Sequence, residues 1–174
     1  YNMRAYEVMA HEIGTMPEFS SEEVTQEEKL AIVSGKVSEY GFLTGDIVDV
    51  TTGKAWGNGN TYSDREWFKT ACKGELGLSD PLLGKSTGKL SFIIAAPIWK
   101  DGKANSSVYA VVFFSLGVEK LQDMVSEIKF SENSCAYILN SSGVTIAHSN
   151  NQTLVDNQSN TIEELEKNAE ENGY

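Results

Sequence analysis

Two apolar runs decide the fold: LSFIIAAPIW at residues 90–99 and SVYAVVFFSL at residues 107–116, separated by KDGKANS. Their length and their content of β-branched and aromatic residues predict two adjacent antiparallel strands, covered on both faces. The pair Asp101-Gly102 supplies the turn between them, and Pro97 predicts a bulge or a strand end. An apolar stripe from Val118 to Ile128 then predicts a helix that packs on the sheet.

Two helices are predicted upstream of these strands. In the first, over residues 1–14, Tyr6, Met9 and Ile13 fall on one face. The second is expected to begin at a capping box of Ser20 with Glu23 and to end at Gly41. Its apolar stripe would face the core, and residues 27–29, Glu-Glu-Lys, would form a solvated surface.

A small strand unit is predicted between the second helix and the apolar runs. Residues 42–50 alternate as a half-buried strand does, and residues 54–57 read as a short return strand. The loop GNGN at 57–60 follows, and a capping box of Ser63 with Glu66 predicts a short helix ending at Gly74. Residues 77–89 are expected to be a polar linker.

The order of elements predicts an α+β fold with a meander-like antiparallel sheet. Near the C-terminus, residues 135–139 and 144–148 flank the turn NSSG and predict a second, small hairpin. A lone hairpin has too few strands for independent stability, so it packs on the first module or opens a second sheet.

Composition excludes several classes of function. The formal net charge is −11, and so acidic a surface repels phosphate backbones, so we expect no nucleic-acid partner. No run approaches the roughly 18 apolar residues of a spanning helix. Cys72 and Cys135 are expected to be separate, buried, inert thiols, although a bridge between them is not tested by the sequence. Neither a metal site nor a cofactor is predicted, and the common catalytic motifs are missing.

The stretch YSDREWFKTA at residues 62–71 carries the chemistry. Arg65 beside Trp67, Phe68 and Tyr62 is what a small carboxylate needs, because the guanidinium forms a bidentate fork and the rings exclude water. Asp80 is expected to neutralise Arg65 or to meet an ammonium on the ligand. The alternative is that Arg65 makes a structural salt bridge and the aromatic residues are core.

The run TYSDREWFKTACKGELGLSDPLLGKSTGKLSFIIAAPIWKDGK at residues 61–103 resembles the core of Cache sensor domains. The resemblance implies a PAS-like antiparallel sheet flanked by a long N-terminal helix, in the extracytoplasmic part of a bacterial chemoreceptor, sensor kinase or diguanylate cyclase. It also implies three segments: an N-terminal helical segment (1–41), a membrane-distal ligand-binding module (42–130) and the start of a truncated membrane-proximal module (131–174). SCAYILNSSGVTIAHSN at 134–150 looks like the opening of that second module.

The amino-acid-binding members of that family have an Arg-x-Trp-aromatic run, matched here by Arg65, Trp67 and Phe68. Two positions depart from their pattern. The tyrosine expected five residues before the arginine is Asn60, with Tyr62 nearby, and the aspartate of the last long strand falls near residues 113–115, Phe-Phe-Ser. Without that aspartate, the ammonium of an α-amino acid lacks its usual partner. The sequence therefore favours a carboxylate or another small metabolite as the ligand over a plain α-amino acid. The predicted ligand-binding residues are Tyr62, Arg65, Trp67, Phe68, Asp80 and Ser115.

These observations favour a ligand-sensing module without catalytic residues, whose N-terminal helix relays occupancy through the membrane. The alternative is an interaction or dimerisation module with a vestigial pocket, in which Tyr6, Met9 and Ile13 form the dimer face. A hydrolase that uses Asp46, Asp49 or Asp64 is the weakest interpretation, because surface acids commonly lie two residues apart.

Overall fold

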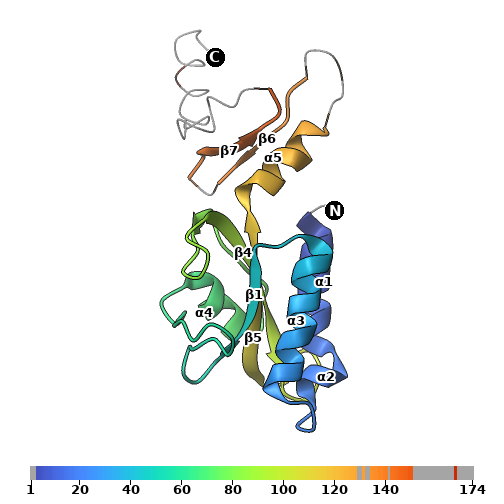
Figure 1. Cartoon of the computed structure of the whole chain (residues 1–174). Helices are drawn as coiled ribbons and strands as arrows, with labels where there is room; N and C mark the ends of the chain where they lie inside the picture. Colours follow the sequence, from blue (N-terminus) through green and yellow to red (C-terminus); the bar gives the residue numbers. More distant parts are fainter. Residues whose placement is uncertain (1–2, 129–130, 132–133, 141, 151–166, 168–174) are drawn as a thin grey trace. The chain divides into compact units, whose positions relative to one another are not determined.

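The computed structural model describes residues 3–128, 131, 134–140, 142–150 and 167. The chain divides into two compact units, Tyr1–Gly117 and Val118–Tyr174. Helices and an antiparallel sheet form an α+β architecture of the predicted class (Figure 1). The ranges that the sequence suggested for the family's modules, with a boundary at residue 130, stay a prediction.

Unit 1 is built on an antiparallel sheet with the strand order β1-β5-β4-β2, and β3 also pairs with β4. The strands are β1 (Thr44–Asp49), β2 (Gly77–Leu78), β3 (Leu82–Leu83), β4 (Leu90–Trp99) and β5 (Val108–Gly117). The predicted central pair is therefore confirmed as β4 and β5. The short strands β2 and β3 lie where the sequence predicted only a polar linker.

Pro97 lies inside β4, where it pairs with Val111 of β5. The register shift comes later, between Ile98 and Trp99. On the other side of β4, strand β2 pairs only with Ala95 and Ile94. Proline is tolerated in this strand because β2 stops before reaching it, so that edge of β4 needs no N–H donor there.

Three helices precede the sheet: α1 (Met3–Thr15), α2 (Pro17–Ser20) and α3 (Gln26–Tyr40). The predicted capping box of Ser20 with Glu23 is wrong, because Pro17 starts a separate short helix that ends at Ser20. The box that forms is Thr25 with Glu28: the Glu28 amide donates to Thr25 Oγ1, and the Thr25 amide donates to Glu28 Oε2 at 2.8 Å. The hydrogen bond from the Thr25 backbone is the main reason that the pKa of Glu28 is lowered.

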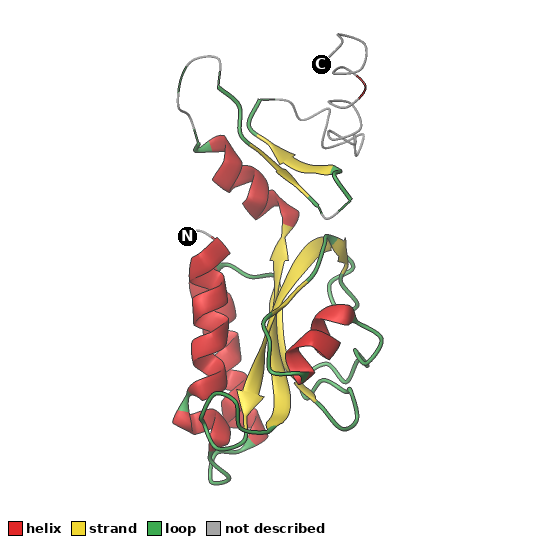
Figure 2. Cartoon of the chain, turned by 180° about the vertical axis from the view of Figure 1, so that it is seen from behind, coloured by secondary structure: helices red, strands yellow, loops and turns green. Residues whose placement is uncertain are grey.

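The helices α1 and α3 cover one face of the sheet, with α1 on β4 and β5 and α3 on β1 (Figures 1 and 2). The stripe of Tyr6, Met9 and Ile13 is buried in this contact, with at most 4% of each side chain exposed. These three side chains therefore belong to the core of unit 1, and the suggestion that they form a dimer face is wrong. Gly14 permits the close contact, because a Cβ there would lie 2.0 Å from the Pro97 carbonyl oxygen.

Helix α4 (Glu66–Cys72) covers the opposite face of the sheet (Figures 1 and 2). Successive residues of a strand point to opposite faces, so alternate residues of β4 and β5 meet α4. Ile93, Ala95, Val111 and Phe113 form this second core with the buried side chains of α4. Apolar side chains on both faces explain why the two strands read as continuous apolar runs.

The predicted solvated surface at residues 27–29 is wrong at one position. Lys29 is only 7% exposed, whereas Glu27 and Glu28 are exposed. The Lys29 ammonium donates to the Ser21 carbonyl oxygen at 2.9 Å, and it lies 5.6 Å from the centroid of the Tyr109 ring. The connection between α2 and α3 folds over this lysine, which periodicity within a single helix could not reveal.

Residues 54–57 do not form the predicted return strand. They make only isolated bridges, between Val48 and Ala55 and between Lys54 and Thr61. The segment is fixed instead by Asp46, a buried carboxylate of β1 that accepts hydrogen bonds from the Gly57 and Asn58 amides at 2.9 Å each. Asp46 therefore braces a loop, and its surroundings give no support to a catalytic role.

Unit 2 is described as helix α5 (Val118–Ser126) and the predicted hairpin of β6 (Tyr137–Leu139) and β7 (Thr145–His148). Gln122 of α5 holds the hairpin, because its amide accepts from the His148 N–H and donates to the His148 carbonyl. Most of residues 151–174, part of the predicted second module, lie outside the described residues.

Both cysteines are free. Cys72 is half-buried, and burial raises the pKa of its thiol, whereas Cys135 is exposed, so the expectation of two buried thiols is wrong for Cys135. Within the described part of the chain, no helix has the length and apolar character that crossing a membrane requires.

Candidate ligand-binding site

A hollow lies beside the start of α4, on the face of the sheet opposite α1 and α3. The loop of residues 57–60 leads into it, and Asp46 fixes the start of this loop. Tyr62 follows, 4% exposed, and its hydroxyl accepts a hydrogen bond from the Asn58 side chain at 3.3 Å. The buried carboxylate thus determines where the first aromatic side chain of the site is placed.

Helix α4 begins later than the sequence suggested. Arg65 is its N-cap, with an extended backbone and no side-chain cap hydrogen bond, so the capping box of Ser63 with Glu66 is wrong. Arg65 consequently precedes the first turn, and its side chain, 27% exposed, lies 3.7 Å from Asp64. The carboxylate beside this cation is that of Asp64, its neighbour in the sequence.

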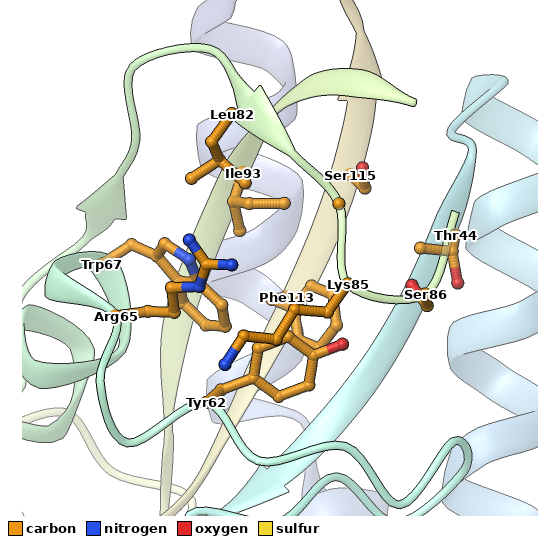
Figure 3. A pocket seen from close by; sticks show the side chains of 11 residues that line it. Thr44, Tyr62, Arg65, Trp67, Leu82, Lys85, Ser86, Ile93, Phe113 and Ser115 are labelled. Atoms are coloured by element: carbon orange, nitrogen blue, oxygen red, sulfur yellow. The ribbon is translucent and has the colours of Figure 1, made fainter. Parts of the chain in front are cut away.

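Three rings pack together in the wall of the hollow. The ring centroids of Tyr62 and Trp67 are 5.5 Å apart, those of Tyr62 and Phe113 5.0 Å, and those of Trp67 and Phe113 5.1 Å. Figure 3 shows this group together with Arg65 and Lys85. Aromatic contacts at these distances stabilise the wall beyond the burial of apolar area alone.

Lys85 closes the hollow from the turn after β3. Its ammonium donates to the Thr61 carbonyl and to Asp64 Oδ1, each at 2.7 Å, and it lies 5.5 Å from the centroid of the Tyr62 ring. The hydrogen bond from Lys85, helped by the charge of Arg65, lowers the pKa of Asp64. Both cations therefore share one exposed carboxylate, and part of their charge is left for a ligand.

We call the hollow the aromatic pocket. Two cations, three aromatic residues, two aliphatic residues, three hydroxyl residues and one glycine line it: Arg65, Lys85, Tyr62, Trp67, Phe113, Leu82, Ile93, Thr44, Ser86, Ser115 and Gly84 (Figure 3). None of these described lining residues is acidic. Its cavity volume is only about 10 Å³, which admits roughly one water molecule, so the pocket is closed in this structure.

The structure brings four of the six predicted residues to this pocket: Tyr62, Arg65, Trp67 and Ser115. Phe68 lies behind them in the core, 6.1 Å from Trp67 between ring centroids. Asp80 is exposed and is not among the residues that line the pocket.

Sequence reasoning missed Lys85 and Phe113 as lining residues. Lys85 lies in the segment Gly-Lys-Ser-Thr-Gly, and this composition predicts a loop but does not indicate a binding residue. Phe113 occupies one of the strand positions where an aspartate was expected, and its ring fills that space. Ser115, two residues further on the same face, donates to Ser91 Oγ at 2.8 Å and is buried.

Metal chemistry gains no support from the described residues, among which no group of three or more histidine, cysteine or acidic side chains could hold a metal ion. The lining offers two cations to an anionic group, rings that exclude water and hydroxyl groups for polar contacts.

Several solved structures share the fold of the chain. The ligand-binding domain of the Campylobacter jejuni chemoreceptor Tlp3, in complex with 4-methylisoleucine, matches 87% of this chain and 61% of its own at a TM-score of 0.64 and 16% identity. The corresponding domain of Pseudomonas fluorescens chemoreceptor CtaA, with L-isoleucine, matches 85% and 61% at a TM-score of 0.63 and 15% identity.

The extracellular domain of the putative histidine kinase mmHK1S-Z2 matches 88% of this chain and 68% of its own, at a TM-score of 0.61 and 14% identity. The chain thus spans about three fifths of the length of the chemoreceptor domains. No curated protein sequence matches it. The model of the Cache domain family matches residues 4–174. The resemblance noted in the sequence is confirmed, and the chain belongs to the Cache domain family.

Proposed function

We propose that the chain is the extracytoplasmic ligand-sensing domain of a membrane-anchored signalling receptor, and that its aromatic pocket binds a small metabolite bearing a carboxylate or an amino group. One observation carries the proposal: Arg65 and Lys85 lie beside three packed rings, and the described lining contains no acid. The solved chemoreceptor domains that share the fold, two of them with 4-methylisoleucine and L-isoleucine bound, support it.

The pocket suits the carboxylate end of such a ligand. The planar guanidinium of Arg65 can form two parallel hydrogen bonds to a carboxylate, and the neighbouring rings strengthen this contact by excluding water. Trp67 and Tyr62 offer apolar faces to the body of the ligand, with Phe68 supporting Trp67 from behind. Ser115 is assigned a polar contact, and Asp80 is assigned to a cationic group that extends out of the pocket.

A ligand can enter only if the segment around Lys85 moves, because the closed pocket holds about one water molecule. Asp64, the partner of the Lys85 ammonium, has 61% of its side chain exposed. Exposed ion pairs contribute little to stability, so breaking the contact between Lys85 and Asp64 to admit a ligand costs little free energy. A ligand carboxylate would take the place of Asp64 as the partner of Lys85.

The movement would reach the helices through the sheet. Ile93 and Phe113, in β4 and β5, line the pocket, while α1 packs against the other face of the same two strands. A ligand shifts this packing only by binding one arrangement more tightly than the other. In the receptor, α1 would carry that shift toward a signalling domain.

The test is a calorimetric binding screen of the full chain against carboxylates, amino acids and amines, with Arg65→Ala as the pocket variant. Arg4, the other arginine of the sequence, is exposed on α1, so Arg4→Ala is a matched control. We expect binding that Arg65→Ala reduces at least about tenfold, a loss of about 1.4 kcal/mol, and that Arg4→Ala leaves unchanged. No binding by a folded chain across these classes would overturn the proposal.

The small cavity favours a second candidate: an interaction or dimerisation module with a vestigial pocket. In this version Arg65 and Lys85 serve only as partners of Asp64, and no metabolite binds. Sedimentation analysis separates the two. A stable dimer that forms without any metabolite, and that Arg65→Ala leaves unchanged, would favour the second candidate. We assign the chain no catalytic role in either version.

A further inference from the structure

A second hollow lies on the helical side of unit 1, between the α2–α3 connection and the turn that joins β4 to β5. We call it the polar hollow. Its lining comprises residues 20–22, Lys29 of α3, residues 100–101 of the β4–β5 turn and Tyr109 of β5. Its volume is about 390 Å³, within the range of small-molecule sites. Every lining residue carries a polar or charged group.

Lys29 lines the polar hollow and is only 7% exposed. Its ammonium donates to the Ser21 carbonyl at 2.9 Å and, at 3.4 Å, to the Tyr109 hydroxyl, which itself donates to the Phe19 carbonyl. Among the residues that the structure describes, no carboxylate lies within 4.0 Å of this ammonium. A buried cation that meets only neutral oxygens lacks a counter-ion, because buried charges are normally paired.

The charges at the rim differ from the charge at the floor. Glu22 and Asp101, both exposed, place two carboxylates there, and Lys100, also exposed, adds one ammonium. With Lys29, the lining holds two positive and two negative groups, so it carries no net charge. A dianion would meet the rim carboxylates unfavourably, and a simple cation would leave Lys29 without a partner.

The geometry points to a small zwitterion: we propose that the polar hollow binds an aminocarboxylate, with its carboxylate on the Lys29 ammonium and its ammonium beside Glu22 and Asp101. Hydrogen bonds between charged partners are the stronger ones, and the buried position of Lys29 increases their strength. The burial that lowers the pKa of Lys29 is opposed by the charge of Glu22, and a bound carboxylate would act in the same direction as Glu22. This site is separate from the aromatic pocket and does not depend on its function.

The experiment is calorimetric titration of the full chain with glycine, β-alanine and 4-aminobutyrate, in which the two charges are progressively further apart. Acetate and methylammonium carry one charge each and serve as single-charge probes. We expect at least one zwitterion to bind about tenfold or more tightly than either single-charge probe. Acetate binding as tightly as every zwitterion, or no binding by any probe, would overturn the proposal.

Two variants locate the binding. Arg65→Ala disables the aromatic pocket, so the titrations are repeated in this variant, where zwitterion binding should remain. Adding Lys29→Met, which keeps a long side chain without the charge, should abolish the binding that remains. Zwitterion binding that Arg65→Ala alone abolishes would assign the binding to the aromatic pocket and overturn the proposal. If Lys29→Met does not fold, the double variant Glu22→Gln/Asp101→Asn, altered only at exposed positions, should remove the preference for zwitterions over acetate. A preference that survives this double variant would also overturn the proposal.

Discussion

The aromatic pocket and the polar hollow lie on opposite faces of one sheet and are built on different principles. The first is walled by three packed rings and is closed, with a volume of about 10 Å³. The second is lined by residues that carry polar or charged groups, and its volume is about 390 Å³. Apolar side chains close on one another when no ligand is present, whereas charged groups keep a hollow hydrated.

The two sites therefore differ in how far their residues contribute to the stability of the fold as well as to ligand binding. The rings of the aromatic pocket belong to the core of unit 1, so changing them costs stability as well as binding. Three groups of the polar hollow, Glu22, Lys100 and Asp101, are exposed, so they can be altered at small cost. The following four predictions test this contrast, beginning with the largest expected effect.

Replacing Trp67 by alanine should lower the free energy of unfolding by about 3–5 kcal/mol, because it removes a large core side chain and leaves a cavity. Trp67 is 3% exposed and touches Tyr62, Phe68 and Phe113. The matched change in the polar hollow, Lys29→Met, should shift the same quantity by less than about 1 kcal/mol, because it removes an unpaired buried charge. Urea unfolding measures both, and similar losses would contradict the contrast.

Asp46→Asn should lower the free energy of unfolding by about 2 kcal/mol. The buried carboxylate accepts hydrogen bonds from the Gly57 and Asn58 amides, and the NH₂ group of an asparagine would face one of these two donors. Asp49→Asn is the control, since Asp49 caps a more exposed turn through the Thr51 and Thr52 amides. Thermal unfolding followed by circular dichroism gives both values. Equal losses would show that burial does not set the cost.

Tyr109 gives the polar hollow a pH signature. Burial raises the pKa of its phenol from 10.0 to about 12, so the folded state holds this proton more tightly than the unfolded state does. The resulting stabilisation is present below pH 10 and is lost as the pH rises toward 12, by about 1–2 kcal/mol. Tyr109→Phe should therefore lose less stability across this interval than the wild type. If the free energy of unfolding falls equally with pH in Tyr109→Phe and in the wild type, the Tyr109 phenol is solvated and the prediction is wrong.

Lys85→Met should have the smallest effect on stability, below about 1 kcal/mol, because the Asp64 side chain that it contacts is 61% exposed. The same change should raise the pKa of Asp64, which the hydrogen bond from Lys85 lowers. NMR titration of the aspartate carboxyl measures that shift. Lys36→Met, which removes the exposed contact with Glu39 on α3, is the control and should leave the Asp64 titration unchanged.

Much of the fold was predictable because its strongest signals are local. The apolar content of β4 and β5, the stripe of α1 and the turn between β6 and β7 all lie within short windows of sequence. The errors occurred where a distant contact overrides a local signal. Ser20 with Glu23 matched a capping box as well as Thr25 with Glu28 does, and only the short helix started by Pro17 distinguishes them.

The candidate site was predictable to a smaller extent. Tyr62, Arg65 and Trp67 are close in sequence, so their grouping was visible in one motif. Lys85 joins them from a turn that no periodicity marks, and Phe113 joins from a strand read only as core. Lys29 was assigned to solvent because the segment that buries it belongs to a different element.

The close contact between Gly14 and the Pro97 carbonyl allows the packing of α1 on β4 to be altered without changing a residue of either hollow. A side chain at position 14 would enter the space of a backbone oxygen that cannot rotate away. Gly14→Ala would therefore act as a one-carbon wedge between α1 and β4, at a point that belongs to neither hollow. If the proposed function holds, this wedge would change both the output of a receptor and its ligand affinity without altering any residue of the pocket, because coupling between two sites is reciprocal.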